Sequence, residues 1–128
     1  MTPDTLFAAL AHPLRVRLLS LLLAEKELCV CDLGAIVGAP QPTISRHLAM
    51  LRRAGLVEVR TEGRWKHYAL AAPKTRLHRL LLRALDRCVD EGPDLVADRA
   101  RLEGHAIALR CGPATGDARR ASRRRRGR

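Results

Sequence analysis

Aromatic residues are almost absent from this 128-residue sequence, which contains one Phe, one Trp and one Tyr. The hydrophobic residues make up 47% of the chain and are mostly Leu, Ala and Val. With so few aromatic rings, the core must be built from aliphatic side chains, and this composition favours helices packed on helices. The length is enough for one domain with a buried core, and not for two.

Long hydrophobic runs are also missing. The longest, Leu18–Ala24, is interrupted by Ser20 and is far too short to span a bilayer. No charged-then-apolar signal segment opens the chain. We therefore expect a cytoplasmic protein with no membrane partner, in which thiols serve metal or redox chemistry more often than structure.

Motifs for catalysis are absent as well. The sequence has no Cys-x-x-Cys at a strand-to-helix turn, no Gly-rich phosphate loop and no paired carboxylates with a His. We therefore expect no enzymatic activity, although a thiol-dependent reductase is the enzyme class that the cysteines would allow.

Positive charge is abundant, with a formal net charge of +11 at pH 7. Such a balance indicates a polyanionic partner, most commonly DNA. Part of the charge has a second interpretation, because seven of the last ten residues are Arg. An Arg-rich end either adds nonspecific affinity for phosphates or serves solubility.

The hydrophobic spacing predicts a mainly α-helical domain with a small β-hairpin. Helices are expected at Thr2–Ala11, Pro13–Ala24, Cys31–Val37, Gln41–Ala54 and Lys74–Glu91, with a hairpin over Leu56–Leu70 that turns at Glu62-Gly63. We assign residues 1–92 to one domain and 93–109 to a short final helix interrupted at Gly104. Residues 110–128 are assigned to a disordered Arg-rich tail.

Two short helices joined by a tight turn and followed by a hairpin are the order of a winged helix-turn-helix. Ile44, Leu48 and Leu51 form an inward stripe on the fourth helix, which leaves its other face free for a DNA major groove. The candidate DNA-binding residues are Gln41, Thr43, Ser45, Arg46 and His47 on that helix, and Arg60, Arg64 and Lys66 on the hairpin. The alternative is that these residues are only solvated surface.

One stretch resembles a known metal-sensing motif. Glu27-Leu28-Cys29-Val30-Cys31-Asp32-Leu33 is similar to the metalloid-binding box of the ArsR/SmtB family of repressors. Three further stretches resemble that family: Leu10-Ala11-His12-Pro13-Leu14-Arg15, Gln41-Pro42-Thr43-Ile44-Ser45-Arg46-His47-Leu48 and Leu51-Arg52-Arg53-Ala54-Gly55-Leu56-Val57.

The resemblance implies a homodimer that binds an inverted-repeat operator, represses a small resistance operon and loosens when arsenite or antimonite binds Cys29 and Cys31. Trivalent arsenic is soft and prefers thiolate sulfur. Two cysteines that are two residues apart on a helix face nearly opposite directions. We therefore expect capture to unwind the start of the third helix and to displace the fourth.

The third ligand of the metalloid stays open. The position three after Cys31, where the family's box often carries another Cys, is Gly34. Cys88 or Cys111 would have to supply a third sulfur, unless an exogenous thiol does so or only two sulfurs bind. Cys88 is otherwise a small buried apolar residue of the dimer helix, and Cys111 an idle thiol.

Two other functions fit the same residues. A repressor of the same fold would use these cysteines to sense cadmium, lead or thiol oxidation, since softness alone does not exclude them. A nonspecific chromosome-packaging protein would explain the basic tail.

Overall fold

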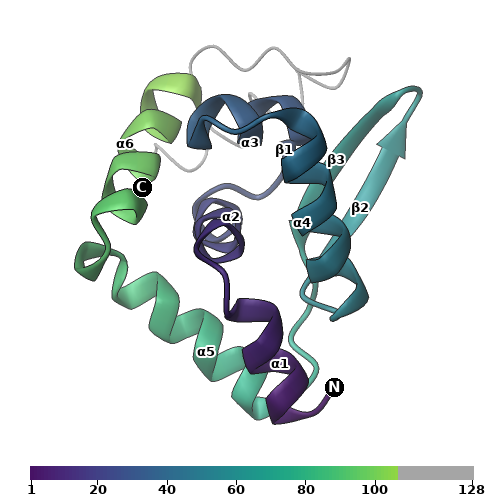
Figure 1. Cartoon of the computed structure of the whole chain (residues 1–128), viewed down its shortest axis with the longest axis vertical. Helices are drawn as coiled ribbons and strands as arrows, with labels where there is room; N and C mark the ends of the chain where they lie inside the picture. Colours follow the sequence, from purple (N-terminus) through teal and green to yellow (C-terminus); the bar gives the residue numbers. More distant parts are fainter. Residues whose placement is uncertain (107–128) are drawn as a thin grey trace.

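The computed structural model describes residues 1–106, so Cys111 and the expected tail lie outside the described residues. The elements in chain order are α1 (Pro3–Leu10), α2 (Pro13–Ala24), β1 (Leu28–Cys29), α3 (Val30–Val37), α4 (Gln41–Arg53), β2 (Val57–Glu62), β3 (Trp65–Leu70), α5 (Arg76–Arg87), a 3-10 turn η1 (Val89–Glu91) and α6 (Pro93–Ala106). The mainly helical winged helix-turn-helix is confirmed, with α2 at the centre of the helices (Figure 1).

Some elements differ from expectation, including the hairpin turn, which lies at Gly63-Arg64 because Glu62 still pairs with Trp65. The sheet has a third strand, because β1 pairs antiparallel with β3 and places Cys29 opposite His67. The helix expected over Lys74–Glu91 ends as α5 at Arg87, since Cys88 leaves the helical conformation and the 3-10 turn follows. The final helix α6 runs through Gly104 without a break.

Local chemistry sets the helix starts and stops. Thr2 and Thr5 form a reciprocal capping pair at the start of α1. His12 caps α2, where its Nδ1 accepts a hydrogen bond of 3.1 Å from the backbone N–H of Leu14. Gly38 ends α3 with φ +75°, a left-handed conformation that glycine adopts without strain. That stop leaves a short turn before α4 begins at Gln41.

The core forms around α2. Leu18, Leu19 and Leu21 of this helix have no exposed surface. The inward stripe of α4 is confirmed, because Ile44, Leu48 and Leu51 are equally buried. Burial of that stripe fixes which face of α4 is left outside.

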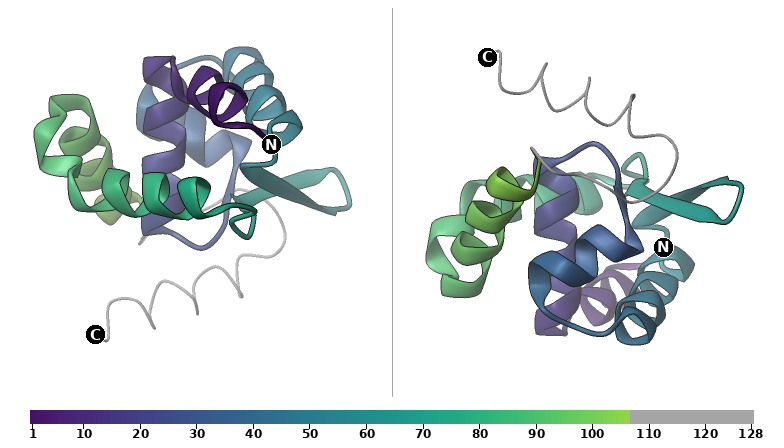
Figure 2. Two further views of the ribbon diagram at one scale, coloured as in Figure 1. Left: turned by 90° about the horizontal axis from the view of Figure 1, so that it is seen from below. Right: turned by 90° about the horizontal axis from the view of Figure 1, so that it is seen from above.

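The hairpin of β2 and β3 projects away from the helices (Figure 2). Within residues 1–106 no single helix is both long and apolar enough to cross a membrane. Only α1 and α2 taken together pass that test, with a bend of 95° between them.

Replacing Leu48 with Ala tests the packing of α4. We expect Leu48→Ala to lower the free energy of unfolding by about 2–5 kcal/mol, because the cavity adds to the lost burial. The measurement is denaturant unfolding at a fixed protein concentration. Val96→Ala is the control, since the Val96 side chain is exposed. Equal effects of the two substitutions would contradict the assignment of Leu48 to the core.

Candidate nucleic-acid interface and cysteine site

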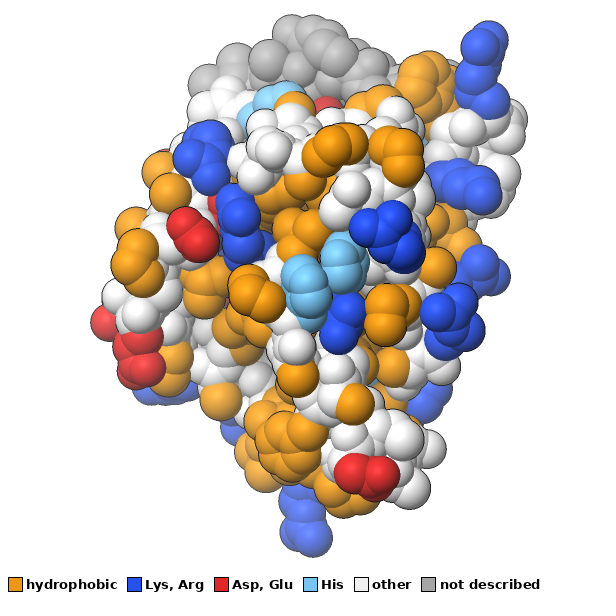
Figure 3. All heavy atoms as spheres, in the orientation of Figure 1, with side chains coloured by type: hydrophobic (Ala, Val, Ile, Leu, Met, Phe, Trp, Pro, Cys, Tyr) orange, Lys and Arg blue, Asp and Glu red, His pale blue; other side chains and the backbone are white. Residues whose placement is uncertain are grey.

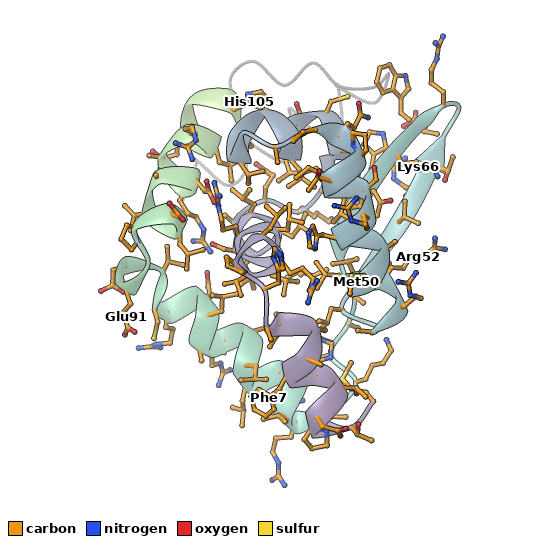
Figure 4. All side chains as sticks on the ribbon, in the orientation of Figure 1. Phe7, Met50, Arg52, Lys66, Glu91 and His105 are labelled. Atoms are coloured by element: carbon orange, nitrogen blue, oxygen red, sulfur yellow. The ribbon has the colours of Figure 1, made fainter. Side chains whose placement is uncertain are left out.

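A cleft of about 820 Å³ lies between α4 and the hairpin. Its lining residues are Cys29, Val30, Cys31, Gln41, Ser45, Ala49, Arg52, Arg53, Arg64, Trp65, Lys66 and Tyr68. Lys and Arg side chains gather on this side of the molecule (Figure 3), and Figure 4 labels Arg52 of α4 and Lys66 of β3 there. The cleft therefore joins a basic rim to both cysteines of the metalloid-like box.

The exposed face of α4 contains most of the residues expected to read DNA. Gln41 and Ser45 line the cleft, Arg46 is exposed, and Thr43 is half-buried. Arg52 and Arg53 also line the cleft, although they were not among the expected DNA-binding residues. The signal for both was their spacing of seven and eight residues from Ser45, which returns to the same side of a helix.

His47 does not stand on that exposed face. Its side chain is buried, and its Nδ1 accepts a hydrogen bond of 3.2 Å from the Arg15 guanidinium. The ring of His12 lies 4.3 Å from it, centroid to centroid. Burial, and then the positive neighbours His12, Arg15 and Arg46, hold the pKa of His47 below its usual value. We therefore treat His47 as a contact between α2 and α4, and remove it from the groove-facing set.

Arg60 is not a free cation of the hairpin. Its Nε and Nη2 donate to the Glu27 carboxylate at 2.9 and 2.8 Å, and Nη1 donates to Glu62 at 3.2 Å. This pairing raises the pKa of Arg60 and lowers that of Glu27. Arg64 and Lys66 are exposed and have no ion pair within residues 1–106. The hairpin therefore presents two of the three expected cations to solvent.

The two cysteines of the box occupy different environments. Cys29 ends β1 and is buried, with its Sγ 3.1 Å from Asp32 Oδ2. Cys31 lies in the first turn of α3, is exposed, and has its Sγ 3.9 Å from Gln41 Nε2. Cys29 is disulfide-bonded in this structure, whereas the thiols of Cys31 and Cys88 are free. Metal capture by Cys29 therefore requires reduction of its disulfide.

The donor chemistry of the box fits a soft ion, but the geometry is not preformed. No group of three or more His, Cys, Asp and Glu side chains converges within residues 1–106 in a metal-binding arrangement. A Cβ at Gly34 would lie only 3.1 Å from the carbonyl oxygen of Ala39. The turn between α3 and α4 therefore leaves little room for a further cysteine at position 34.

Cys88 lies elsewhere. In the single chain its side chain is exposed at the end of α5, where the helical conformation stops, and its burial on a dimer helix stays a prediction. It lines a second, apolar pocket of about 290 Å³ between α1 and α5, and not the cleft of Cys29 and Cys31. Phe7 and Leu80, on the same two helices, are 53% and 48% exposed. An apolar face is thus left uncovered on α1 and α5.

Comparisons with known proteins agree with this fold. Residues 12–59 match the model of the family described as "Bacterial regulatory protein, arsR family". The chain is 46% identical over 70 residues to the arsenic resistance transcriptional regulator ArsR1 of Pseudomonas putida, covering 55% of each chain. It is 46% identical over 71 residues to the arsenical resistance operon repressor of Escherichia coli, covering 56% of this chain and 61% of the repressor.

Other relatives have different names. An uncharacterized HTH-type transcriptional regulator of Methanocaldococcus jannaschii is 38% identical over 71 residues, covering 56% of this chain and 80% of that protein. A transcriptional repressor SmtB homolog of Synechocystis is 48% identical, over 51% of this chain and 48% of the homolog. A cadmium resistance regulator CadC homolog of Staphylococcus aureus is 39% identical, over 50% and 53%. The match spans little more than half the length of the first curated relatives.

Solved structures extend the comparison. HlyU from Vibrio cholerae has a TM-score of 0.58 at 33% identity, covering 66% of this chain and 88% of that one. The homodimeric winged helix-turn-helix DNA-binding domain of Mb0332 from Mycobacterium bovis has a TM-score of 0.56 at 31% identity, covering 70% and 83%.

The buried imidazole of His47 predicts a dependence of stability on pH. Its pKa is lowered from 6.5 in the folded state, so the unfolded chain takes up the proton first. The free energy of unfolding should therefore fall as the pH drops below about 6.5. In His47→Gln, an amide oxygen still accepts from Arg15 and nothing titrates, so the fall should be smaller. Denaturant unfolding between pH 7.5 and 5.5 measures both proteins, and equal falls would contradict the assignment.

Proposed function

The chain belongs to the ArsR family of bacterial regulatory proteins, and from that premise we propose the following function. The protein is a transcriptional repressor that binds an inverted-repeat operator as a homodimer. It releases the operator when Cys29 and Cys31 bind arsenite or antimonite. The observation that carries the proposal is the shared cleft, in which both cysteines and the exposed residues of α4 and the hairpin lie together.

The DNA-binding part rests on the chemistry of the exposed residues. Gln41 and Arg46 lie near the N-terminal end of α4, the part of a recognition helix that usually reaches base edges. Their side chains form paired hydrogen bonds to adenine and guanine. Arg52, Arg64 and Lys66 are placed for phosphates, which supply affinity and register more than sequence choice.

Dimer formation is supported by the uncovered face of α1 and α5. Phe7 and Leu80 expose large apolar side chains beside the pocket between these helices. Self-association through this face removes them from water. A dimer with two-fold symmetry presents two copies of α4, which matches an operator made of two inverted half-sites.

Metalloid capture at the box has a direct structural consequence. Cys29 ends β1 and Cys31 lies in the first turn of α3, and we propose that drawing both sulfurs onto one ion changes that turn. Each sulfur–arsenic bond forms as a thiol proton and an arsenite hydroxyl leave together as water. Gln41 lies against Cys31, so the start of α4 is affected by the same change.

The release of DNA then follows from differential binding. A metalloid that binds better to the altered α3 shifts the population toward the state whose α4 helices no longer fit the groove. We propose that Cys29 and Cys31 are the two protein ligands and that a hydroxyl or an exogenous thiol completes the coordination. Cys88 is left out because it lines the other pocket.

A second candidate keeps the DNA binding and changes the signal. The matches to the SmtB and CadC homologs favour a repressor that senses another soft metal, such as cadmium or lead, through the same cysteines. Thiol oxidation is a related alternative. Operator release measured with each metal, and with arsenite and a competing metal together, separates these signals.

The hairpin cations give a prediction about salt. In Arg64→Gln, the slope of log K against log[salt] should fall by about 0.9 for each phosphate that the side chain no longer neutralises. In Arg60→Gln the slope should stay unchanged, because Glu27 and Glu62 already neutralise this guanidinium. The double variant Glu27→Gln, Glu62→Gln is the matched control, in which a released Arg60 steepens the slope. Operator titrations between 50 and 200 mM salt are the measurement, and an equal fall in slope for Arg60→Gln and Arg64→Gln would contradict the pairing.

The cysteine box gives a prediction about induction. Arsenite should weaken operator binding by the reduced wild-type protein by roughly 5- to 150-fold. The double variant Cys29→Ser, Cys31→Ser should bind the operator without arsenite but should not release it. Cys88→Ser is the control and should respond like the wild type. A gel-shift titration measures all three, and release of the double variant by arsenite would rule out the proposed site.

A further inference from the structure

The last described helix, α6, lies against α2 and α3 on the side of the molecule away from the hairpin (Figure 1). It falls outside residues 12–59, which match the family model. Leu102 inserts from α6 into the hydrophobic core. Since α3 contains Cys31 and follows Cys29, the polar contacts between α6 and α3 bear directly on the cysteine site.

One set of contacts fixes the C-terminal end of α3. Asp98 of α6 is completely buried and accepts hydrogen bonds from Arg17 at 2.8 Å and from Arg101 at 2.7 Å. The same arginines reach the last turn of α3, where Arg17 donates to the carbonyl of Val37 at 3.2 Å and Arg101 to that of Ile36 at 2.7 Å. Such carbonyls have no partner within their own helix, so these guanidinium groups satisfy them.

A second contact fixes the N-terminal end of α3. His105 of α6 lies near the junction with α3 (Figure 4), and its Nε2 is 2.8 Å from Asp32 Oδ1. Asp32 belongs to the first turn of α3, and its other carboxylate oxygen is 3.1 Å from Cys29 Sγ. One carboxylate therefore touches both a cysteine of the box and α6.

We propose that α6 is a clamp on α3 that sets the concentration of metalloid needed to release DNA. A helix of eight residues is unstable by itself, so its stability comes from tertiary contacts. A change in its first turn that moves Asp32 breaks the contact with His105. That contact therefore favours the DNA-binding state over the released one. His105 and Arg101 are positioning residues, because they act through α3.

This inference rests on the proposed function only where it concerns the inducer. The mechanical part concerns the stability of α3 and is measured without any metalloid. A weaker clamp lets α3 open more often, which raises the exchange of its backbone amide hydrogens with solvent. It also lowers the concentration of metalloid that releases the operator.

The experiment uses His105→Ala and Arg101→Ala in the full chain. Hydrogen exchange at the amides of residues 33–37 should become about fivefold faster or more in each variant. The arsenite concentration for half-release of operator DNA should fall by a similar factor. Glu103→Ala is the control, because this residue of α6 is exposed. His105→Gln retains an N–H donor for Asp32 and should restore slow exchange.

Each result has a defined meaning. Unchanged exchange in both Ala variants overturns the clamp, whatever arsenite does. If exchange becomes faster but the arsenite concentration for half-release of the operator is unchanged, α6 does not set the sensitivity to arsenite. If the wild type does not release DNA with arsenite, the proposed function fails, and exchange in α3 alone then decides whether the clamp exists.

Discussion

The marginal stability of α3 is the constraint on which the rest of the structure depends. An eight-residue helix does not persist in water without tertiary support. Here that support comes from the core beneath Leu33 and from α6 at both helix ends. At its N-terminal end, α3 follows β1, and the two elements share the cysteine box. At its C-terminal end, a short turn connects α3 to α4, the helix with the candidate DNA-binding residues. This short helix therefore connects the cysteines that we propose as the metalloid site to the helix that we propose to bind DNA.

The arginines of this protein differ in their partners, so they do not all contribute equally to its surface charge. The formal net charge of +11 does not distinguish among the arginines, which make different contacts in the structure. Arg15 and Arg17 satisfy buried carbonyl groups and side chains between helices. Arg60 is neutralised by carboxylates, whereas Arg64 on the same hairpin is left exposed. The cations paired with carboxylates, such as Arg17 and Arg60, contribute less to attraction of a polyanion than the unpaired Arg64, so the net charge alone overstates the basic surface.

The parts that sequence reasoning could predict are those set by neighbours along the chain. The helical spacing of Leu48 and Leu51 found the buried face of α4, and the alternation after Leu56 found the hairpin. The residues that were misplaced depend on partners far away in the sequence. His47 turns inward because Arg15 of α2 meets it there. The spacing did signal the inward position, because residue 47 lies three after Ile44 and four before Leu51 on one helix face. Only the contact with Arg15 required the tertiary fold.

Two further differences have the same origin. The strand β1 is only two residues long and exists because β3, nearly forty residues later, pairs with it. Cys88 fits the apolar spacing of α5, but the helix ends just before that residue, so the expected longer helix was wrong at this point. In the candidate site, residue types and spacing identified the cysteines and most of the α4 residues. Their shared cleft required the tertiary fold.

Because the backbone of Cys29 pairs with that of His67, the two cysteines of the box differ in how readily each position tolerates substitution. The backbone of Cys29 is built into the sheet that forms the hairpin, so any substitution that distorts this position also distorts the wing. Cys31 stands on an exposed helical turn, where a different ligand residue costs the scaffold little. In the site that we propose, selectivity for a different ion would therefore be acquired more readily by replacing Cys31 than by moving Cys29.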